Sequence, residues 1–408
     1  MKTQRLVFAV MLLFAEFLSS QAQTRVSNPI ITAVPFLACT PDARGTALGF
    51  SGVATSPDVF SMFYNPAKYA FMQNEHTMIA SGLNVFSIRE LDQFMLFDAF
   101  AQKIGNSAIA ATARYNSCGS MVEVYDEYHQ MLGIYWPKEF AVDVAYSYRF
   151  GDYFSAGVAG RFIYSNLISA FGDMQGVQYN ARSYSVAGDV SVYYKRLLAS
   201  WVDMSLGAAF TNIGTKMSYS SVEGRKDFIP TTLRLGTGFK FIFHPKNSLA
   251  LNLEFSKLMV PTPPIIARDD TGNPMYNEDG SYLIQYGMDD NVSVFRGMFQ
   301  SFFDAPGYAL NYSTGDDERI GSFYEELCEV NTGIGIEYNL ADHFFVRTGY
   351  YYAPPMKGSV NCLTEGLGMK FGIFGMDLSY SLFMYGHGFA PNGQTMNSRL
   401  RWDMYFAF

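Results

Sequence analysis

The stretch ITAVPFLACTPDARGTALGFSGVATSPDVFSMFYNPAKYAF, residues 31–71, fits neither a regular helix nor a regular strand. Gly45, Gly49 and Gly52 fall close together within it. Four prolines interrupt any regular period, at positions 35, 41, 57 and 66. A segment of this kind packs as irregular backbone against walls that another part of the chain supplies. The sequence therefore predicts a plug inside a membrane β-barrel.

The composition agrees with a barrel whose strands face two different solvents. Among 408 residues there are 36 Phe, 28 Tyr and 36 Gly. Charged residues make up 16%, against roughly 25% in a typical soluble domain. The net charge is −8 and no basic cluster is present, which argues against nucleic acid as a partner.

The N-terminus has the pattern of an export signal. Lys2 and Arg5 precede an apolar run over 6–18, and Ser20-Gln21-Ala22 offers a small-x-small cleavage site. Residues 1–22 are therefore predicted to be a signal peptide, and the mature chain to begin at Gln23. A buried first helix is the alternative. No later stretch has the 18 consecutive apolar residues of a membrane helix.

From residue 76 onward apolar and polar residues alternate with the period of two that indicates strands. At the end of the chain, Leu400, Trp402 and Met404 alternate with polar neighbours, and the last residue is Phe408. This ending is typical of the closing strand of an outer-membrane barrel. We predict fourteen strands, near 77–88, 92–102, 107–116, 139–150, 153–166, 182–194, 203–219, 228–243, 248–257, 325–340, 343–352, 362–372, 373–385 and 398–408.

The connections alternate between short and long, as they do in outer-membrane barrels. Short turns such as 151–152 and 341–342 belong to one side, and longer loops such as 117–138, 167–181 and 258–324 to the other. This parity holds only if Ser293 to Asp304 forms a helix in the last loop, as its apolar spacing indicates. Loops of such length are usually functional or disordered.

Motifs for catalysis or metal binding are absent from the sequence. It has no G-x-S-x-G, Cys-x-x-Cys or H-E-x-x-H. His129 and His387 fall in predicted outer loops, where a hydrolase site is an alternative to simple loop polarity. Acidic residues of the 258–324 loop are either a cation site or a solvated surface, and we favour the surface. Sequence spacing does not decide whether the four cysteines pair: Cys39, Cys118, Cys328 and Cys362. We predict no catalytic residue, metal or cofactor.

The opening stretch resembles the N-terminal hatch of the FadL-type transporters. The resemblance rests on Gly45, Gly49, Gly52 and Asp58, followed by Asn65-Pro66-Ala67. It implies an all-β, fourteen-stranded antiparallel transmembrane barrel with a hatch in its lumen. The hatch would be residues 23–75 and the barrel residues 76–408.

A second resemblance covers nearly the whole mature chain. PDAR (41–44), GVATSPD (52–58), EFAVDVAYSYRF (139–150), KDFIPTTLRLGT (226–237) and KLMVPTPP (257–264) resemble the PorV family of the type IX secretion system. The resemblance implies an outer-membrane location in a Bacteroidota-type Gram-negative host. It also implies a shuttle function, in which the barrel docks at an SprA-type translocon and binds cargo by its C-terminal signal domain. Delivery to a PorU-type sortase complex would follow, at a surface rich in lipopolysaccharide.

Partner contacts are expected in the long loops. Leu167, Ile168, Phe171 and Met174 make an apolar tip in one loop, and Phe299, Phe302 and Phe303 lie in the largest. The alternative is that these residues fold back onto the barrel mouth.

Phe50-Ser51 departs from the hatch pattern of the family. Two other functions stay open: a FadL-like transporter of hydrophobic small molecules, with a pocket beside Phe36 or Phe60, and an outer-membrane enzyme acting on lipid A.

Overall fold

The computed structural model describes residues 25–26, 29–72, 77–85, 93–119, 122–125, 131–167, 182–219, 226–269, 271–311, 317–354, 357, 360–385 and 400–408. The predicted signal peptide, residues 1–22, lies outside these residues. Within them, no helix is long and apolar enough to cross a bilayer.

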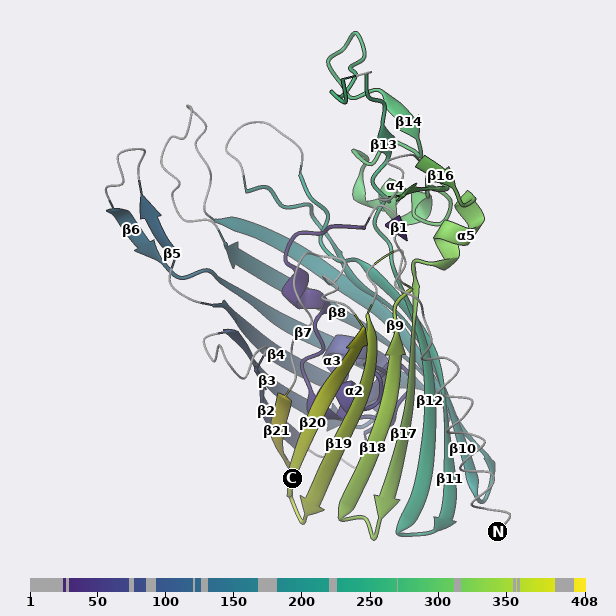
Figure 1. Cartoon of the computed structure of the whole chain (residues 1–408). Coiled ribbons are helices and arrows are strands. Elements are labelled where there is room, and N and C mark those ends of the chain that lie inside the picture. The colour runs from purple at the N-terminus through teal and green to yellow at the C-terminus, as the bar shows by residue number, and fades with distance from the viewer. Residues whose placement is uncertain are drawn as a thin grey trace.

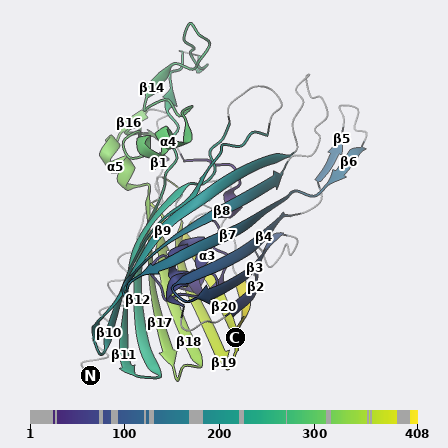
Figure 2. The same ribbon diagram turned by 180° about the vertical axis from the view of Figure 1, so that it is seen from behind.

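Fourteen antiparallel strands form one closed barrel, and this confirms the predicted fold class (Figures 1 and 2). The first strand pairs with the last, with Ile79 opposite Phe406. The strands are β2 (Thr77–Val85), β3 (Gln93–Ile104), β4 (Ser107–Cys118), β7 (Lys138–Phe150), β8 (Phe154–Asn166), β9 (Ser183–Ala199), β10 (Val202–Gly214), β11 (Thr232–His244), β12 (Asn247–Leu258), β17 (Val330–Leu340), β18 (Phe344–Tyr352), β19 (Asn361–Phe371), β20 (Phe374–Tyr385) and β21 (Leu400–Ala407).

The alternation along each strand separates an apolar outer face from a polar inner face. On β7, Val142 and Val144 are exposed on the outside, whereas Asp143 and Ser147 are buried inside. Such a wall satisfies the requirement that every backbone polar group at membrane depth be paired within the protein.

The observed strands differ from the predicted ones at a few ends. The strand predicted at 203–219 ends at Gly214, after a register shift between Phe210 and Ile213 and a left-handed Asn212 (φ 60°). The strand predicted from 325 begins at Val330, because residues 322–327 form helix α5 (Ser322–Leu327). Glu325 of this helix is buried.

Short turns close one end of the barrel and long loops the other (Figure 1). The largest loop, with α5, forms a projecting unit that we call the cap, residues 259–329. It contains the pair β13 (Ile265–Ile266) and β14 (Ile284–Tyr286), helix α4 (Val294–Gln300), and the pair β15 (Tyr308–Asn311) and β16 (Asp317–Arg319). The helix predicted over 293–304 is thus shorter than expected. The loop at 117–138 carries β5 (Val122–Tyr125) and β6 (Met131–Tyr135).

The N-terminal segment descends from the cap into the lumen. Its first described residues form β1 (Arg25–Val26), which pairs with β15 in the cap. The following residues, 30–72, lie inside the barrel, and we call this segment the hatch. It contains η1 (Pro35–Ala38), α2 (Ala43–Ala47), α3 (Ser61–Tyr64) and η2 (Pro66–Phe71) (Figure 1).

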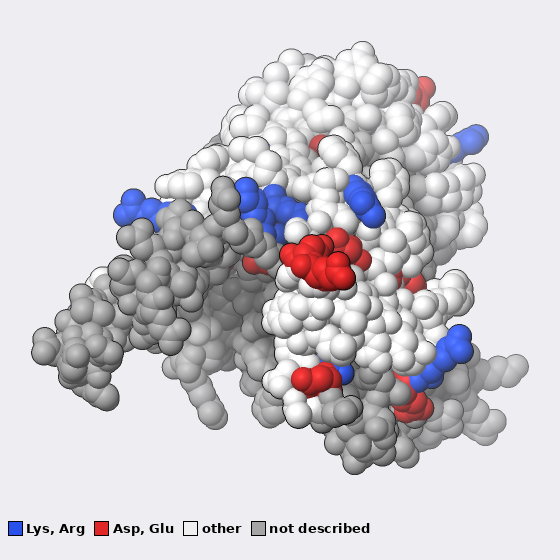
Figure 3. All heavy atoms as spheres, turned by 90° about the horizontal axis from the view of Figure 1, so that it is seen from above, with Lys and Arg blue, Asp and Glu red and all other residues white. Residues whose placement is uncertain are grey.

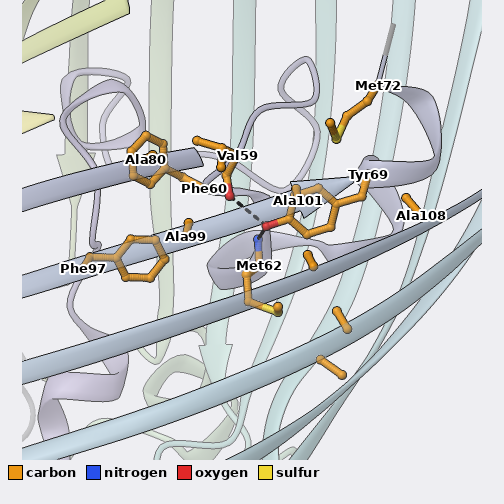
Figure 4. Packing of buried hydrophobic residues seen from close by; sticks show 13 residues of the cluster. Val59, Phe60, Met62, Tyr69, Met72, Ala80, Phe97, Ala99, Ala101 and Ala108 are labelled. Carbon is orange, nitrogen blue, oxygen red and sulfur yellow. Dashed lines mark hydrogen bonds between the residues drawn. The ribbon is translucent and has the colours of Figure 1, made fainter. Parts of the chain in front are cut away.

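The hatch packs on the inner face of β2, β3 and β4. Phe60, Met62 and Tyr69 contact a wall made largely of alanine, with Ala80, Ala99 and Ala101 among them (Figure 4). Tyr69 Oη donates to the carbonyl of Val59 at 2.8 Å and accepts from the N–H of Met62 at 2.9 Å. Small side chains on the wall let the irregular hatch approach the strands closely.

Candidate functional site

The glycines of the hatch make room for one aromatic ring. A Cβ at Gly45 would lie 2.0 Å from Tyr64 Oη, and one at Gly52 would lie 2.2 Å from Tyr64 Cγ. Asp42 caps α2 by accepting from the N–H of Gly45 at 2.6 Å, and it also accepts from Tyr64 Oη at 2.8 Å. The predicted glycines are therefore needed for packing within the hatch.

The other predicted hatch residues fasten the segment to itself and to the wall. Asn65 accepts from the N–H of Ala67 at 3.0 Å and donates to the carbonyls of Val53 and Val192 at 2.9 and 3.0 Å. Pro66 occupies the first turn of η2, where its missing N–H costs nothing. Asp58 pairs with Arg44 at 2.9 Å.

Polar side chains of the wall form hydrogen bonds with the hatch backbone. Glu254 of β12 accepts from the N–H groups of Gly52 and Val53 at 2.7 and 2.8 Å. Thr364 of β19 accepts from the N–H of Gly49 at 3.1 Å, where φ is +67°. Because buried backbone groups must be paired, these wall side chains fix the hatch in position.

A charged cavity of about 320 Å³ lies against the hatch. Arg44 of the hatch bridges Asp58 and Glu337, and Arg347 of β18 bridges Glu337 and Asp377, at distances of 2.5 to 2.9 Å. This network is saturated with ion pairs. It holds Arg44 and the hatch helix α2 to the barrel wall.

The cap has a polar interior where it joins the barrel. Lys257 of β12 pairs with Glu326 at 3.1 Å and contacts Glu329. Lys357 pairs with Glu325 at 2.7 Å and with Glu329 at 2.9 Å. Burial alone would raise the pKa of Glu329, but Lys357 and Lys257 outweigh burial and hold that pKa below its usual range.

A second buried acid, Asp304, extends this interior. Its Oδ2 accepts from the N–H of Thr262 at 3.2 Å. Burial raises the pKa of Asp304 to about 7, and the charges of Glu326 and Glu329 act in the same direction. Asp304 Oδ1 and Gln300 Oε1 are both buried acceptors with no donor in the described part of the chain. A proton on Asp304 would supply one.

The outer side of the cap is apolar and aromatic. Phe295 and Phe299 of α4 are 69% and 70% exposed, and Phe323 of α5 is 78% exposed. The full set, which we call the aromatic face, is Phe295, Phe299, Phe302, Phe303, Phe323, Tyr324 and Leu327. Seen from above, most of the described surface is neither basic nor acidic (Figure 3).

Both cap helices leave large apolar side chains in solvent. α4 buries Gly297, Met298 and Gln300 while it exposes Phe295 and Phe299, and α5 buries Glu325 while it exposes Phe323 and Tyr324. A surface helix of a soluble domain turns most of its apolar stripe inward. A large exposed apolar surface marks a contact with a protein or a membrane.

The predicted partner-binding residues have mixed outcomes. Phe299, Phe302 and Phe303 lie exposed on the aromatic face, and Leu167 lies half-buried just beyond β8. The other positions predicted to contact partners, Ile168, Phe171 and Met174, lie outside the described residues, as do His129 and His387 of the hydrolase alternative. Phe295 shares the helical stripe of Phe299 but was not among the predicted positions. Phe323 and Tyr324 were not predicted either, because a strand was expected to start beside them.

The described residues offer no group of three or more His, Cys, Asp or Glu side chains that could hold a metal ion. All four cysteines carry free thiols within the described residues, and burial raises the pKa of the Cys328 thiol in the cap. The arrangement is that of a plugged barrel with exposed aromatic side chains on its cap.

A closed barrel with an apolar outer wall, a lumenal plug and long loops on one side defines an outer-membrane β-barrel protein. The family model described as type IX secretion system protein PorV matches residues 20–265. The chain belongs to this PorV family of the type IX secretion system, as the sequence resemblance indicated.

No curated protein matches the chain. Similar solved structures include the Ralstonia pickettii toluene transporter TbuX, at 12% identity, 90% and 96% coverage of the two chains and a TM-score of 0.46. The Pseudomonas putida toluene transporter TodX matches at 12% identity, 89% and 95% coverage and a TM-score of 0.46. A Pseudomonas aeruginosa FadL homologue matches at 8% identity, 94% and 98% coverage and a TM-score of 0.40. TM-scores below 0.5 add nothing to the assignment.

Proposed function

We propose that this chain is an outer-membrane shuttle of the type IX secretion system. It binds secreted cargo by the C-terminal signal domain at an SprA-type translocon and delivers the cargo to a PorU-type sortase complex. In this proposal it is not an enzyme, residues 1–22 are a cleaved signal peptide, and the hatch remains shut throughout the cycle.

The observation that carries the proposal is the aromatic face of the cap. A barrel that only moved small molecules would have no use for phenylalanines that project from two helices above its mouth. A shuttle needs a surface that binds a folded protein and releases it, and exposed aromatic anchors are the residues that dominate such interfaces. Phe295 and Phe299, four residues apart on α4, present adjacent rings to one partner pocket.

The hatch supports the same assignment. Glu254 and Thr364 hold the plug through its backbone, and Asn65 of the plug donates to a wall carbonyl, so cargo would be carried on the outside of the barrel. Phe36 and Phe60, beside which the alternative transporter function would need an apolar pocket, are 0% and 2% exposed. The cavity that Phe60 lines is charged, with Glu337 and Arg347 in its wall. Both rings are packed in the clusters that join hatch to wall.

The test is the double substitution Phe295→Asp with Phe299→Asp in the full-length protein in its own outer membrane. Both side chains are exposed, so the barrel should fold, which heat-modifiable migration on a gel would verify. We expect cargo that retains its C-terminal signal domain to co-purify at least about tenfold less, as for loss of a hot spot.

The matched control is Phe243→Asp. Phe243 is 66% exposed at the opposite end of the barrel, beside the short turn after β11. It makes the same chemical change without touching the cap and should leave cargo recovery unchanged. Equal cargo recovery from the cap variant and the control would overturn the proposal that the aromatic face binds cargo.

A further inference from the structure

One carboxyl group on the barrel faces outward in the middle of the apolar wall. Asp98 lies on β3 between Leu96 and Phe100, and like them it is on the outer face, where it is exposed. The stretch from Asp98 to the turn at Gly105 spans roughly 18 Å, given about 3.3 Å per residue and a tilt of about 40°. Asp98 therefore lies well inside an apolar band about 25 Å tall.

The neighbours of Asp98 on the same face include no charged group, and the hydroxyl of Ser81 is the one polar side chain directly opposite it. In the strand register, Ser81 of β2 and Ala113 of β4 lie directly opposite it. No hydrogen bond or ion pair of Asp98 is found within the described residues, which include all of β2, β3 and β4.

A hollow in the wall surrounds this carboxyl group. It has a volume of about 580 Å³, and its lining includes Asp98, Ser81, Ala111 and Ala113, together with the apolar Ile79 and Phe100. We call it the lateral notch. On the inner side of the same strands, Ala80 and Ala99 pack against the hatch (Figure 4).

Ionisable residues that face lipid are costly, and an intramembrane carboxyl is retained where it meets a specific partner. We propose that the lateral notch is a docking site for a membrane-embedded segment of another outer-membrane protein, which brings a lysine or arginine to Asp98. The small side chains at positions 81, 111 and 113 leave the volume into which that side chain inserts.

Charge complementarity favours this occupant over the alternatives. Acyl chains cannot pair with a carboxylate, and fatty acids and lipopolysaccharide carry charge of the same sign. A cationic side chain on a spanning segment brings the opposite charge to the right depth, and such a pair in low dielectric is strong. The inference rests on the proposed function, in which the chain docks at a partner in the same membrane.

A second outward carboxyl provides a matched comparison. Glu365 of β19 is exposed on the outer face, but it lies opposite Thr348 and Tyr380, whose hydroxyls offer polar neighbours. It does not line the notch. A general effect of removing charge from the wall would therefore appear equally in Glu365→Gln and Asp98→Asn.

The experiment places the photocrosslinking residue p-benzoylphenylalanine at Ala113 in the full-length protein and irradiates intact outer membranes. The control position is Ala208, on the outer face of β10 away from the notch. We expect a crosslink from position 113, and not from 208, to a spanning segment that contains lysine or arginine. The crosslinked peptide is identified by mass spectrometry.

Asp98→Asn should lower this crosslink about tenfold, and Glu365→Gln should leave it unchanged. Combining Asp98→Arg with an acidic replacement of the partner's basic residue should restore it. The proposal is overturned by a crosslink only to lipid, by equal crosslinking from position 208, or by insensitivity to Asp98→Asn. Cargo recovery is measured in the same membranes. An absent crosslink with normal cargo recovery rejects the notch alone. Cargo recovery that does not fall when the aromatic face is substituted rejects the shuttle.

Discussion

Glu254 in the barrel wall and Gly52 in the hatch are joined by a hydrogen bond of 2.7 Å, in which the glycine N–H donates to the carboxylate. The same carboxylate accepts from the N–H of Val53 and pairs with Arg234 at 2.9 Å. One carboxylate thus hydrogen-bonds to the backbone of the plug and forms an ion pair with a neighbouring strand. The contact explains how an irregular segment, with no sheet of its own, keeps its buried backbone paired.

Replacing Glu254 with alanine should loosen the plug. It removes the acceptor of two backbone donors and leaves Arg234 buried without this carboxylate, a loss on the order of 3–5 kcal/mol for a broken buried pair. Single-channel recording in planar bilayers should show frequent openings in Glu254→Ala and few in the native protein. Glu365→Ala, on the outer face, is the control, and equal conductance of all three proteins would mean that Glu254 does not hold the plug.

Bulk added to the wall at Gly207 should displace the hatch. A Cβ at this position of β10 would lie 2.0 Å from the carbonyl oxygen of Val53, whereas one at Gly160 of β8 would have nothing within 4 Å. Gly207→Val should therefore raise the sensitivity of cells to a large hydrophilic antibiotic, at a cost on the order of 1–3 kcal/mol in packing. Gly160→Val should not. Equal sensitivity of both variants would contradict the close packing described here.

The folded cap should be more stable at mildly acidic pH than at alkaline pH. Burial raises the pKa of Asp304 to about 7 from an ordinary value near 4, so the folded cap binds a proton that the unfolded segment releases. Stability from this group is greatest below about pH 4 and is lost as the pH rises through 7. The protection factors of amides across 259–311, in which the intrinsic pH dependence of hydrogen exchange is divided out, should therefore be higher at about pH 5.5 than at pH 8.

Asp304→Asn is the matched variant for this pH effect. An amide cannot ionise, so the difference in protection factor between the two pH values should shrink. Glu329 acts oppositely, because its lowered pKa removes stability only at strongly acidic pH, below the range compared. Protection factors of the native cap that are equal at the two pH values, or lower at pH 5.5, would show that Asp304 does not govern its stability.

Removing a carboxylate from the ion pairs inside the cap should destabilise the cap without unfolding the barrel. Glu329 contacts Lys257 and Lys357, and both lysines are buried. Glu329→Ala leaves two buried cations short of a partner, a destabilisation on the order of 3–5 kcal/mol. Limited proteolysis should then cleave within 259–329 at least tenfold faster, while heat-modifiable migration persists. Glu278→Ala, at an exposed cap position, should behave like the native protein.

The sequence predicts the barrel well because the physics of its wall is periodic. Val142, Asp143 and Val144 alternate over a stretch that must face lipid and lumen by turns, and this pattern alone assigns each side chain to a face. The alternation of short turns and long loops follows from the same architecture. Strand ends were predicted less well where a local event intervened, such as the left-handed Asn212 before the end of β10.

The candidate site was only partly predictable, because it depends on contacts between distant residues. The helical spacing of Phe299, Phe302 and Phe303 indicated a loop helix, but nothing in that spacing says that the phenylalanines face outward. Their direction is set by Gly297, which packs against Phe228 and Pro261, and by the polar partners of the opposite side. Likewise, the buried pairing of Glu329 with Lys357 spans a strand hairpin that no short motif encodes.

The measurement that tests the shuttle most directly is gentle affinity purification of the native protein from its outer membrane, with every retained protein and lipid identified by mass spectrometry. The account predicts secreted proteins that still carry C-terminal signal domains, together with a large translocon or a sortase-like partner. Recovery of the barrel alone, with a stoichiometric fatty acid or other small hydrophobic molecule, would contradict the shuttle and favour a transporter.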